Sequence, residues 1–101
     1  MDAMVELTVI PIGVGVSLSK YIAVCEEILN ERSINHILHA NGTNMVGDFM
    51  ELMGAVHEIH ERLHRLGVPR IATIIKIGTR TDKTQTMEQK IDSVLDKIVE
   101  R

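Results

Sequence analysis

The spacing of apolar residues switches repeatedly along this chain between a strand-like period of two and a helical period. Val5, Leu7 and Val9 share one side of an alternating segment, which predicts a strand at 4–10 that ends at Pro11. Apolar residues then recur at steps of three and four, which predicts a helix. Applied to the whole chain, the two periods predict strands at 4–10, 34–40, 43–46 and 70–77, and helices at 17–31, 49–66 and about 87–98.

The order strand, helix, strand, strand, helix, strand, helix predicts an α+β fold. Two split βαβ units joined by a hairpin at Asn41-Gly42 form a ferredoxin-like βαββαβ sandwich, here with an extra C-terminal helix. Its antiparallel sheet has the order 4-1-3-2, with both major helices on one face. A chain of 101 residues has no room for a second core, so residues 1–101 are expected to form a single domain.

Capping signals support the predicted helix ends. Ser17 or Ser19 can cap the first helix, and Asp48 is suited to cap the second. Gly67 and Pro69 end the second helix. Residues 86–89 (Thr-Met-Glu-Gln) form a capping-box pattern before the last one.

Composition excludes several classes of function. The chain has 11 Lys and Arg against 14 Asp and Glu, a net charge of −3, so it lacks the basic surface needed for nonspecific binding to nucleic acid or anionic membranes. Tyr21 and Phe49 are the whole complement of Tyr, Phe and Trp, too few for a base-stacking platform. Cys25 is the single cysteine, and no segment resembles a targeting or membrane-spanning sequence. We expect a cytoplasmic protein with no cofactor, no nucleic-acid partner and no membrane partner.

One face of the predicted sheet lacks a covering helix. Ile10, Ile37 and Ile74 are candidates for this face, and exposed apolar patches of that kind are unusual in soluble monomers. We therefore expect a second copy to cover the sheet, giving a homodimer, or a homotetramer if dimers pair.

Polar residues of two turns are expected to meet at one end of the sheet. The Gly13-x-Gly15-x-Ser17-x-Ser19 loop opens a helix, so its free amides suit an anion or a polar small molecule; the alternative is an ordinary turn with a serine cap. The topology brings Asn41, Thr43 and Asn44 to the same end. Tyr21 is the one residue near that end able to stack on a ring.

The remaining reactive residues do not predict catalysis or metal binding. His57, His60 and His64 recur at steps of three and four, but His60 falls inside the apolar sector and no further ligand completes a set. Solvated or interfacial histidines are the favoured interpretation. His36 and His39 face opposite sides of a strand, no base is placed beside the loop serines, and the single cysteine lies on the apolar stripe. We expect no catalytic residue, no metal site and no enzyme.

Four motifs carry a resemblance to a known family. They are Val9–Gly13 (VIPIG) with Ser17-x-Ser19-x-Tyr21, Gly42-Thr43 with Gly47, Lys76-Ile77, and Arg80-x-Asp82-Lys83. With these motifs, spread from about residue 5 to residue 98, the chain resembles the small YkoF-related thiamine-binding family.

The resemblance implies ferredoxin-like subunits that assemble into dimers and tetramers through their sheets. It also implies binding of thiamine or its hydroxymethylpyrimidine part without a reaction. The motif match carries Ser17, Ser19 and Thr43 over as pocket residues, and the topology adds the other candidates, Tyr21, Asn41 and Asn44. The alternative is a structural or regulatory oligomer with an anion at the Gly13–Ser19 loop.

One position departs from the family pattern. Many members have a Glu just before the glycine where this chain has Val46. The change removes a carboxylate that could recognise a cationic ligand, or it alters a subunit contact.

Overall fold

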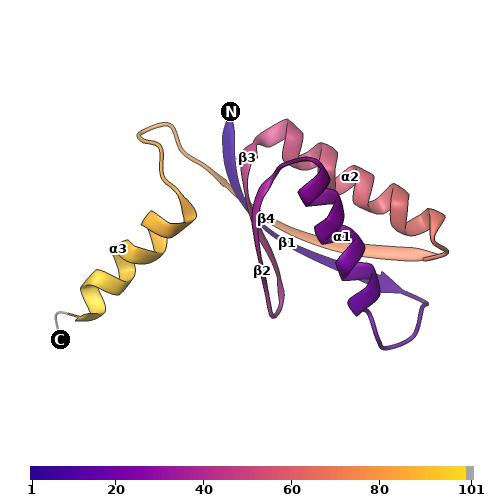
Figure 1. Ribbon diagram of the computed structural model, residues 1–101. Coiled ribbons are helices and arrows are strands. Elements are labelled where there is room, and N and C mark those ends of the chain that lie inside the picture. Colours follow the sequence, from indigo (N-terminus) through magenta and orange to yellow (C-terminus); the bar gives the residue numbers. More distant parts are fainter. Residues whose placement is uncertain (100–101) are drawn as a thin grey trace.

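The computed structural model describes residues 1–99, which form a four-stranded sheet and three helices (Figure 1). The sheet order is β2-β3-β1-β4 with antiparallel pairing throughout, so the predicted order and the ferredoxin-like topology are confirmed. In chain order the elements are β1 (Asp2–Ile12), α1 (Ser19–Glu31), β2 (Asn35–His39), β3 (Gly42–Asp48), α2 (Phe49–Arg65), β4 (Arg70–Thr79) and α3 (Met87–Val99).

The core lies between one face of the sheet and helices α1 and α2. In β1 the alternating residues Val5 and Leu7 are buried, and their β3 partners Met45 and Thr43 are buried with them. The helices present stripes of large aliphatic side chains to this face, and Leu29 and Ile59 are fully buried. The alternating apolar residues of the strands and the apolar stripes of the helices thus pack against each other in a single layer.

Two of the three predicted caps are confirmed. The Glu51 amide donates to the Asp48 carboxylate at 3.2 Å, and Asp48 is the N-cap of α2. At α3, the Gln89 amide donates to the Thr86 hydroxyl at 3.0 Å while the Thr86 amide donates to Gln89 Oε1 at 2.9 Å. This reciprocal pair is a capping box.

The prediction that a serine caps α1 is wrong. Leu18 occupies the N-cap position and makes no side-chain capping bond. Its side chain packs against the core, which places Ser19 already inside the helix, and Ser17 lies outside it in the exposed loop. Leu18 occupies the N-cap position because its side chain packs against the core, although capping preference alone would favour a serine there.

The second face of the sheet carries the isoleucines predicted for it. Ile10 pairs with Ala72, Ile37 with Asn44 and Ile74 with Thr8, all pointing away from α1 and α2. Ile37 is 44% exposed and Ile74 is 61% exposed. Within residues 1–99, no helix covers this side of the sheet (Figure 1).

Helix α3 projects away from the sandwich rather than packing on it (Figure 1). The radius of gyration of 15.4 Å therefore exceeds the roughly 13 Å typical of a compact chain of this length. None of the helices within residues 1–99 combines the length and the hydropathy that crossing a bilayer requires.

Candidate functional site

A pocket opens where β1 extends beyond the β2–β3 hairpin. β1 pairs with β3 only as far as Leu7–Thr43, whereas it pairs with β4 as far as Ile12–Arg70. The next residues of β1 therefore have no strand on the hairpin side. The resulting pocket, about 270 Å³, lies between residues 7–10 of β1, residues 18–26 of the α1 segment and residues 38–43 of the hairpin.

Gly42 keeps the hairpin close to β1 at the edge of this pocket. A Cβ atom at residue 42 would lie 2.6 Å from the Leu7 carbonyl oxygen, closer than non-bonded atoms can approach. The Thr8 hydroxyl also donates to the Asn41 carbonyl at 3.0 Å. Glycine and this hydrogen bond together hold the turn against the strand that forms the pocket's base.

The polar part of the pocket is built around Glu26. The Thr43 hydroxyl, in a residue only 5% exposed, donates to Glu26 Oε2 at 3.0 Å. On the other oxygen, His36 Nε2 lies 3.8 Å from Glu26 Oε1, while His36 Nδ1 donates to the Ile34 carbonyl at 2.7 Å. The hydrogen bond from Thr43 thus fixes the carboxylate against β3, and the His36 ring lies beside it on β2, in a side chain that is only 17% exposed.

The rest of the pocket wall is mainly apolar. Leu18 and Ile22 line it from α1, and Leu38 lines it from β2. Cys25 also lines it, with its thiol donating to the Tyr21 carbonyl at 3.3 Å. Burial raises the pKa of Cys25 to about 12, so this sulfur is a neutral thiol and a poor nucleophile.

The structure brings some of the predicted site residues to this pocket. Asn41 and Thr43 line it, and Leu18, between the two loop serines, lines it as well. Ser17 and Ser19 are exposed on either side of Leu18 and are not among the lining residues. The first-strand loop and the hairpin turn therefore meet at one end of the sheet, as the topology predicted.

Two of the candidate residues, Tyr21 and Asn44, do not line this pocket. Tyr21 is 8% exposed and belongs to the core, because its position on α1 faces the sheet, so its ring is not available for stacking in the pocket. Asn44 pairs with Glu6 and Ile37 on the opposite face of the sheet. A strand places neighbouring residues on opposite sides, so Thr43 and Asn44 cannot both face α1.

Glu26 was missed by the sequence reasoning. It follows Ile22 by one helical turn, a spacing that places it at the edge of the apolar stripe, but from the sequence alone the neighbouring Glu27 is an equally good candidate.

Val46, the departure from the family pattern, pairs with Met4 and Asn35 on the open sheet face. A glutamate at position 46 would therefore lie on the open face of the sheet and would not line this pocket.

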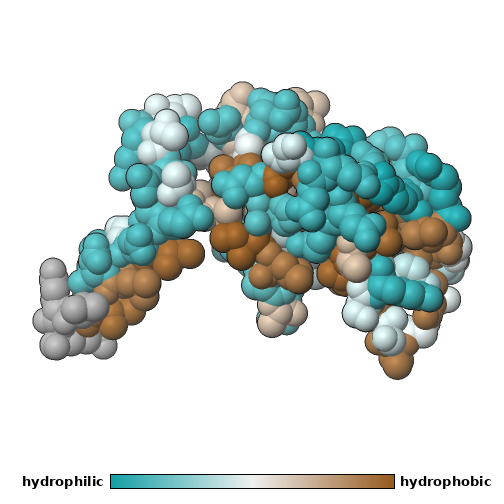
Figure 2. Space-filling model, in the orientation of Figure 1, coloured by the Kyte–Doolittle hydropathy of each residue, from teal (hydrophilic) through white to brown (hydrophobic). Residues whose placement is uncertain are grey.

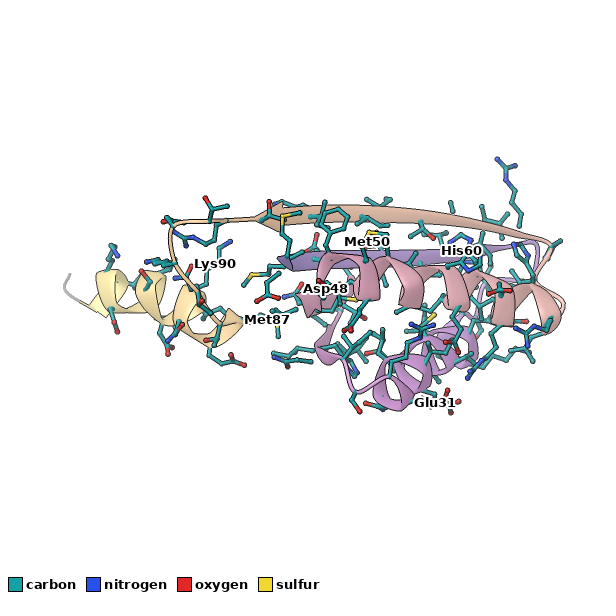
Figure 3. All side chains as sticks on the ribbon, turned by 90° about the horizontal axis from the view of Figure 1, so that it is seen from above. Glu31, Asp48, Met50, His60, Met87 and Lys90 are labelled. Carbon is teal, nitrogen blue, oxygen red and sulfur yellow. The ribbon has the colours of Figure 1, made fainter. Side chains whose placement is uncertain are left out.

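The histidines of α2 have separate surroundings. His60, labelled in Figure 3, places its Nε2 2.6 Å from the Thr73 hydroxyl on β4. His64 Nδ1 donates to the Val68 carbonyl at 2.7 Å, and His57 Nδ1 lies 3.2 Å from Glu61 Oε1. Burial lowers the pKa of His60, and the neighbouring imidazoles lower it further. Within residues 1–99, no three His, Cys, Asp or Glu side chains gather as metal ligands would.

Curated relatives resemble the chain over nearly its full length. A UPF0045 protein of Synechocystis is 48% identical over 94 residues, covering 93% of this chain and 78% of the relative. The UPF0045 protein YqgV of Bacillus subtilis is 37% identical over 97 residues, which cover 91% of this chain and 93% of that relative.

Solved structures share the fold. The hypothetical protein MJ1052 of Methanocaldococcus jannaschii superposes with a TM-score of 0.86 at 30% identity, covering 94% of this chain and 97% of that one. A Thermotoga maritima protein named for thiamine biosynthesis or salvage gives a TM-score of 0.79 at 20% identity, covering 93% and 99%. The family model described as "Thiamine-binding protein" matches residues 5–95. The chain therefore belongs to the thiamine-binding protein family.

Proposed function

We propose that this is a cytoplasmic, non-catalytic protein that binds thiamine or its hydroxymethylpyrimidine part and works as a homo-oligomer. The observation that carries the proposal is the pocket beside β1, with apolar walls and a single positioned carboxylate, in a chain of the thiamine-binding family. Typical small-molecule sites have this composition, an apolar cavity with a few placed polar groups.

The chemistry of the ligand matches the groups in the pocket. A 4-aminopyrimidine carries an amino donor beside a ring nitrogen, and thiamine adds a positive charge on its thiazolium ring. The Glu26 carboxylate can accept from the amino group and favours a cation, while the Thr43 hydroxyl keeps that carboxylate in place. Leu18, Ile22 and Leu38 supply apolar surface for a ring.

The proposal that the protein leaves its ligand chemically unchanged rests on the state and position of its nucleophilic side chains. Cys25 has its thiol protonated at neutral pH, and Ser17 and Ser19 are not among the pocket-lining residues. Thiamine incubated with the protein and recovered should therefore give an unchanged proton NMR spectrum. New resonances that depend on the protein would contradict the non-catalytic assignment.

Calorimetric titration with thiamine and, separately, with hydroxymethylpyrimidine tests the binding. Glu26→Gln removes the charge but keeps the shape, and should weaken thiamine binding by about 10- to 150-fold, because a hydrogen bond to a charged group contributes about 1.5–3 kcal/mol. Glu27→Gln is the matched control, since Glu27 is exposed on the same helix turn and should bind as the wild type does. Absence of heat with both ligands at millimolar concentration would refute the function.

The oligomeric part of the proposal rests on the open face of the sheet. Ile37 and Ile74 keep large exposed fractions there, and a second sheet packed against them would remove both from water in each copy. A two-fold axis through this face makes the contact self-complementary.

A further inference from the structure

We propose that His36 controls the charge of the pocket, so that a cationic ligand binds more weakly as the pH falls. The protonated imidazole pairs with the Glu26 carboxylate and reduces the attraction of that carboxylate for a second cation. His36 is thus a positioning residue that acts through Glu26. The inference rests on the proposed function, because it assigns a regulation to the same pocket.

The backbone fixes the tautomer of His36. Its Nδ1 lies 2.7 Å from the Ile34 carbonyl oxygen. A carbonyl oxygen can only accept, so Nδ1 carries the hydrogen and Nε2 of the neutral ring carries a lone pair. A proton that the ring takes up therefore binds at Nε2.

Nε2 of His36 faces the carboxylate that lines the pocket, with 3.8 Å between Nε2 and Glu26 Oε1. While the ring is neutral both atoms are acceptors, and no hydrogen bond joins them. Protonation makes Nε2 a donor, and a movement of about 1 Å then brings the pair to the distance of a charge-assisted hydrogen bond. The two side chains are only 13% and 17% exposed, so solvent screens this attraction little.

Glu26 is the charged group that the neighbouring elements present to the His36 ring. On β3, the residue opposite His36 in the register is Met45, which is uncharged and fully buried. On α1, Cys25 precedes Glu26 and stays neutral, because burial raises its pKa to about 12. Within residues 1–99, the carboxylate that comes within 4 Å of the His36 ring nitrogens is that of Glu26. A proton on His36 therefore acts first on Glu26.

Glu26 is also the charge that a cation meets in the pocket. It lines the pocket, whereas His36 lies behind it and is not among the lining residues. The lining residues, all within the described part of the chain, include no lysine, no arginine and no second carboxylate. In Figure 2 the β2–β3 hairpin carries apolar surface beside the hydrophilic outer side of α1. Pairing of Glu26 with protonated His36 therefore removes most of the attraction for a cation and leaves the apolar contacts in place.

His39 is the second histidine at this pocket, and it lies on the other side of β2. Its Nδ1 accepts from the Asn41 amide at 3.3 Å, and its Nε2 lies 3.8 Å from Glu6 Oε2. A proton on His39 is therefore directed to Glu6 and not to Glu26. This difference makes His39 the natural comparison for His36.

The direction of the effect follows from which form of His36 pairs with Glu26. Histidine side chains change charge between about pH 5 and pH 8. Near the upper end the ring is neutral and Glu26 is free to attract a cation, whereas near the lower end the two side chains are paired. The thiazolium ring of thiamine keeps its charge throughout, so the affinity should rise with pH. By reciprocity, a cation bound beside Glu26 should release the proton from His36.

Calorimetric titration with thiamine at about pH 8 and about pH 5.5 tests the inference. The dissociation constant of the wild type should be about 3- to 10-fold larger at the lower pH. His36→Gln keeps a polar side chain that cannot be protonated, so it should lose this ratio, and the comparison removes any titration of the ligand itself. His39→Gln should keep the wild-type ratio. A wild-type protein that binds equally at both pH values, or an unchanged ratio in His36→Gln, overturns the inference.

Nuclear magnetic resonance of the ligand-free wild type tests the same coupling without a substitution. Nitrogen shifts should place the imidazole hydrogen on Nδ1 of His36 at about pH 8, and the carboxylate carbon of Glu26 should shift as His36 gains its proton. A hydrogen on Nε2 at that pH, or a Glu26 resonance that does not follow His36, overturns the inference. Coupled titration of the two side chains with no heat from thiamine at either pH would instead refute the proposed ligand, and the control of the pocket charge by His36 would stand.

Discussion

Ile74→Lys on β4 is the sharpest test of the open sheet face. Ile74 is 61% exposed and points away from α1 and α2, so the fold of the single chain loses little when it becomes polar. Complete burial of an isoleucine side chain contributes about 1.5–3 kcal/mol, so burying the exposed three-fifths is worth about 1–2 kcal/mol in each copy. Across a two-fold contact the loss is about 2–4 kcal/mol, before any repulsion between two facing lysines.

That loss corresponds to a dissociation constant of the sheet-packed dimer raised by about 30- to 700-fold. Sedimentation velocity over a concentration series should show the variant dissociating at concentrations where wild type stays associated. Ala23→Lys, on the exposed side of α1, introduces the same charge away from the sheet and should leave the constant unchanged. An unaltered association constant in Ile74→Lys, with a folded chain, would refute the reasoning that this face is an interface.

Three further predictions concern the single chain. Ile59→Ala in the fully buried α2 stripe should lower the free energy of unfolding by about 2–5 kcal/mol in urea denaturation, and a loss below 1 kcal/mol would contradict its central place in the core. Because burial raises the folded-state pKa of Cys25 from 9.0 to about 12, the folded chain keeps a proton that the unfolded chain releases; stability should therefore fall as pH rises from about 9 toward 12, and Cys25→Ala should lack that component of the pH dependence. Thr86→Ala removes half of the capping box and should destabilise the first turn of α3 by about 0.5–2 kcal/mol, seen as faster amide exchange there but not in the control Thr84→Ala.

The core and the topology could be predicted because they follow from local periodicity. Val5 and Leu7 are buried in β1, and the alternation that places them on one side is visible in the sequence. Asp48 and Thr86 act as caps because the hydrogen bonds they make are to residues three positions away. Such features need no knowledge of distant parts of the chain.

The site was predicted only in part, because it depends on distant elements. Thr43 and Asn41 reach the pocket as expected, but Asn44 faces the other side because the register with β1 decides which residue of each adjacent pair faces the helices. Glu26 differs from Glu27 only in the folded chain, where α1 packs beside β3 and the Thr43 hydroxyl donates a hydrogen bond to Glu26.

The amino-acid sequence by itself determined the order of strands and helices, the apolar side of each, and the turns that join them, since these arise from interactions between residues close in the chain. Tertiary structure alone decided that α1 brings a carboxylate to the end of β3, that the ring of Tyr21 is buried, and that α3 leaves the sandwich with its apolar side open. These outcomes depend on how far β1 extends past the hairpin and on the direction of the loop after β4, which long-range packing sets.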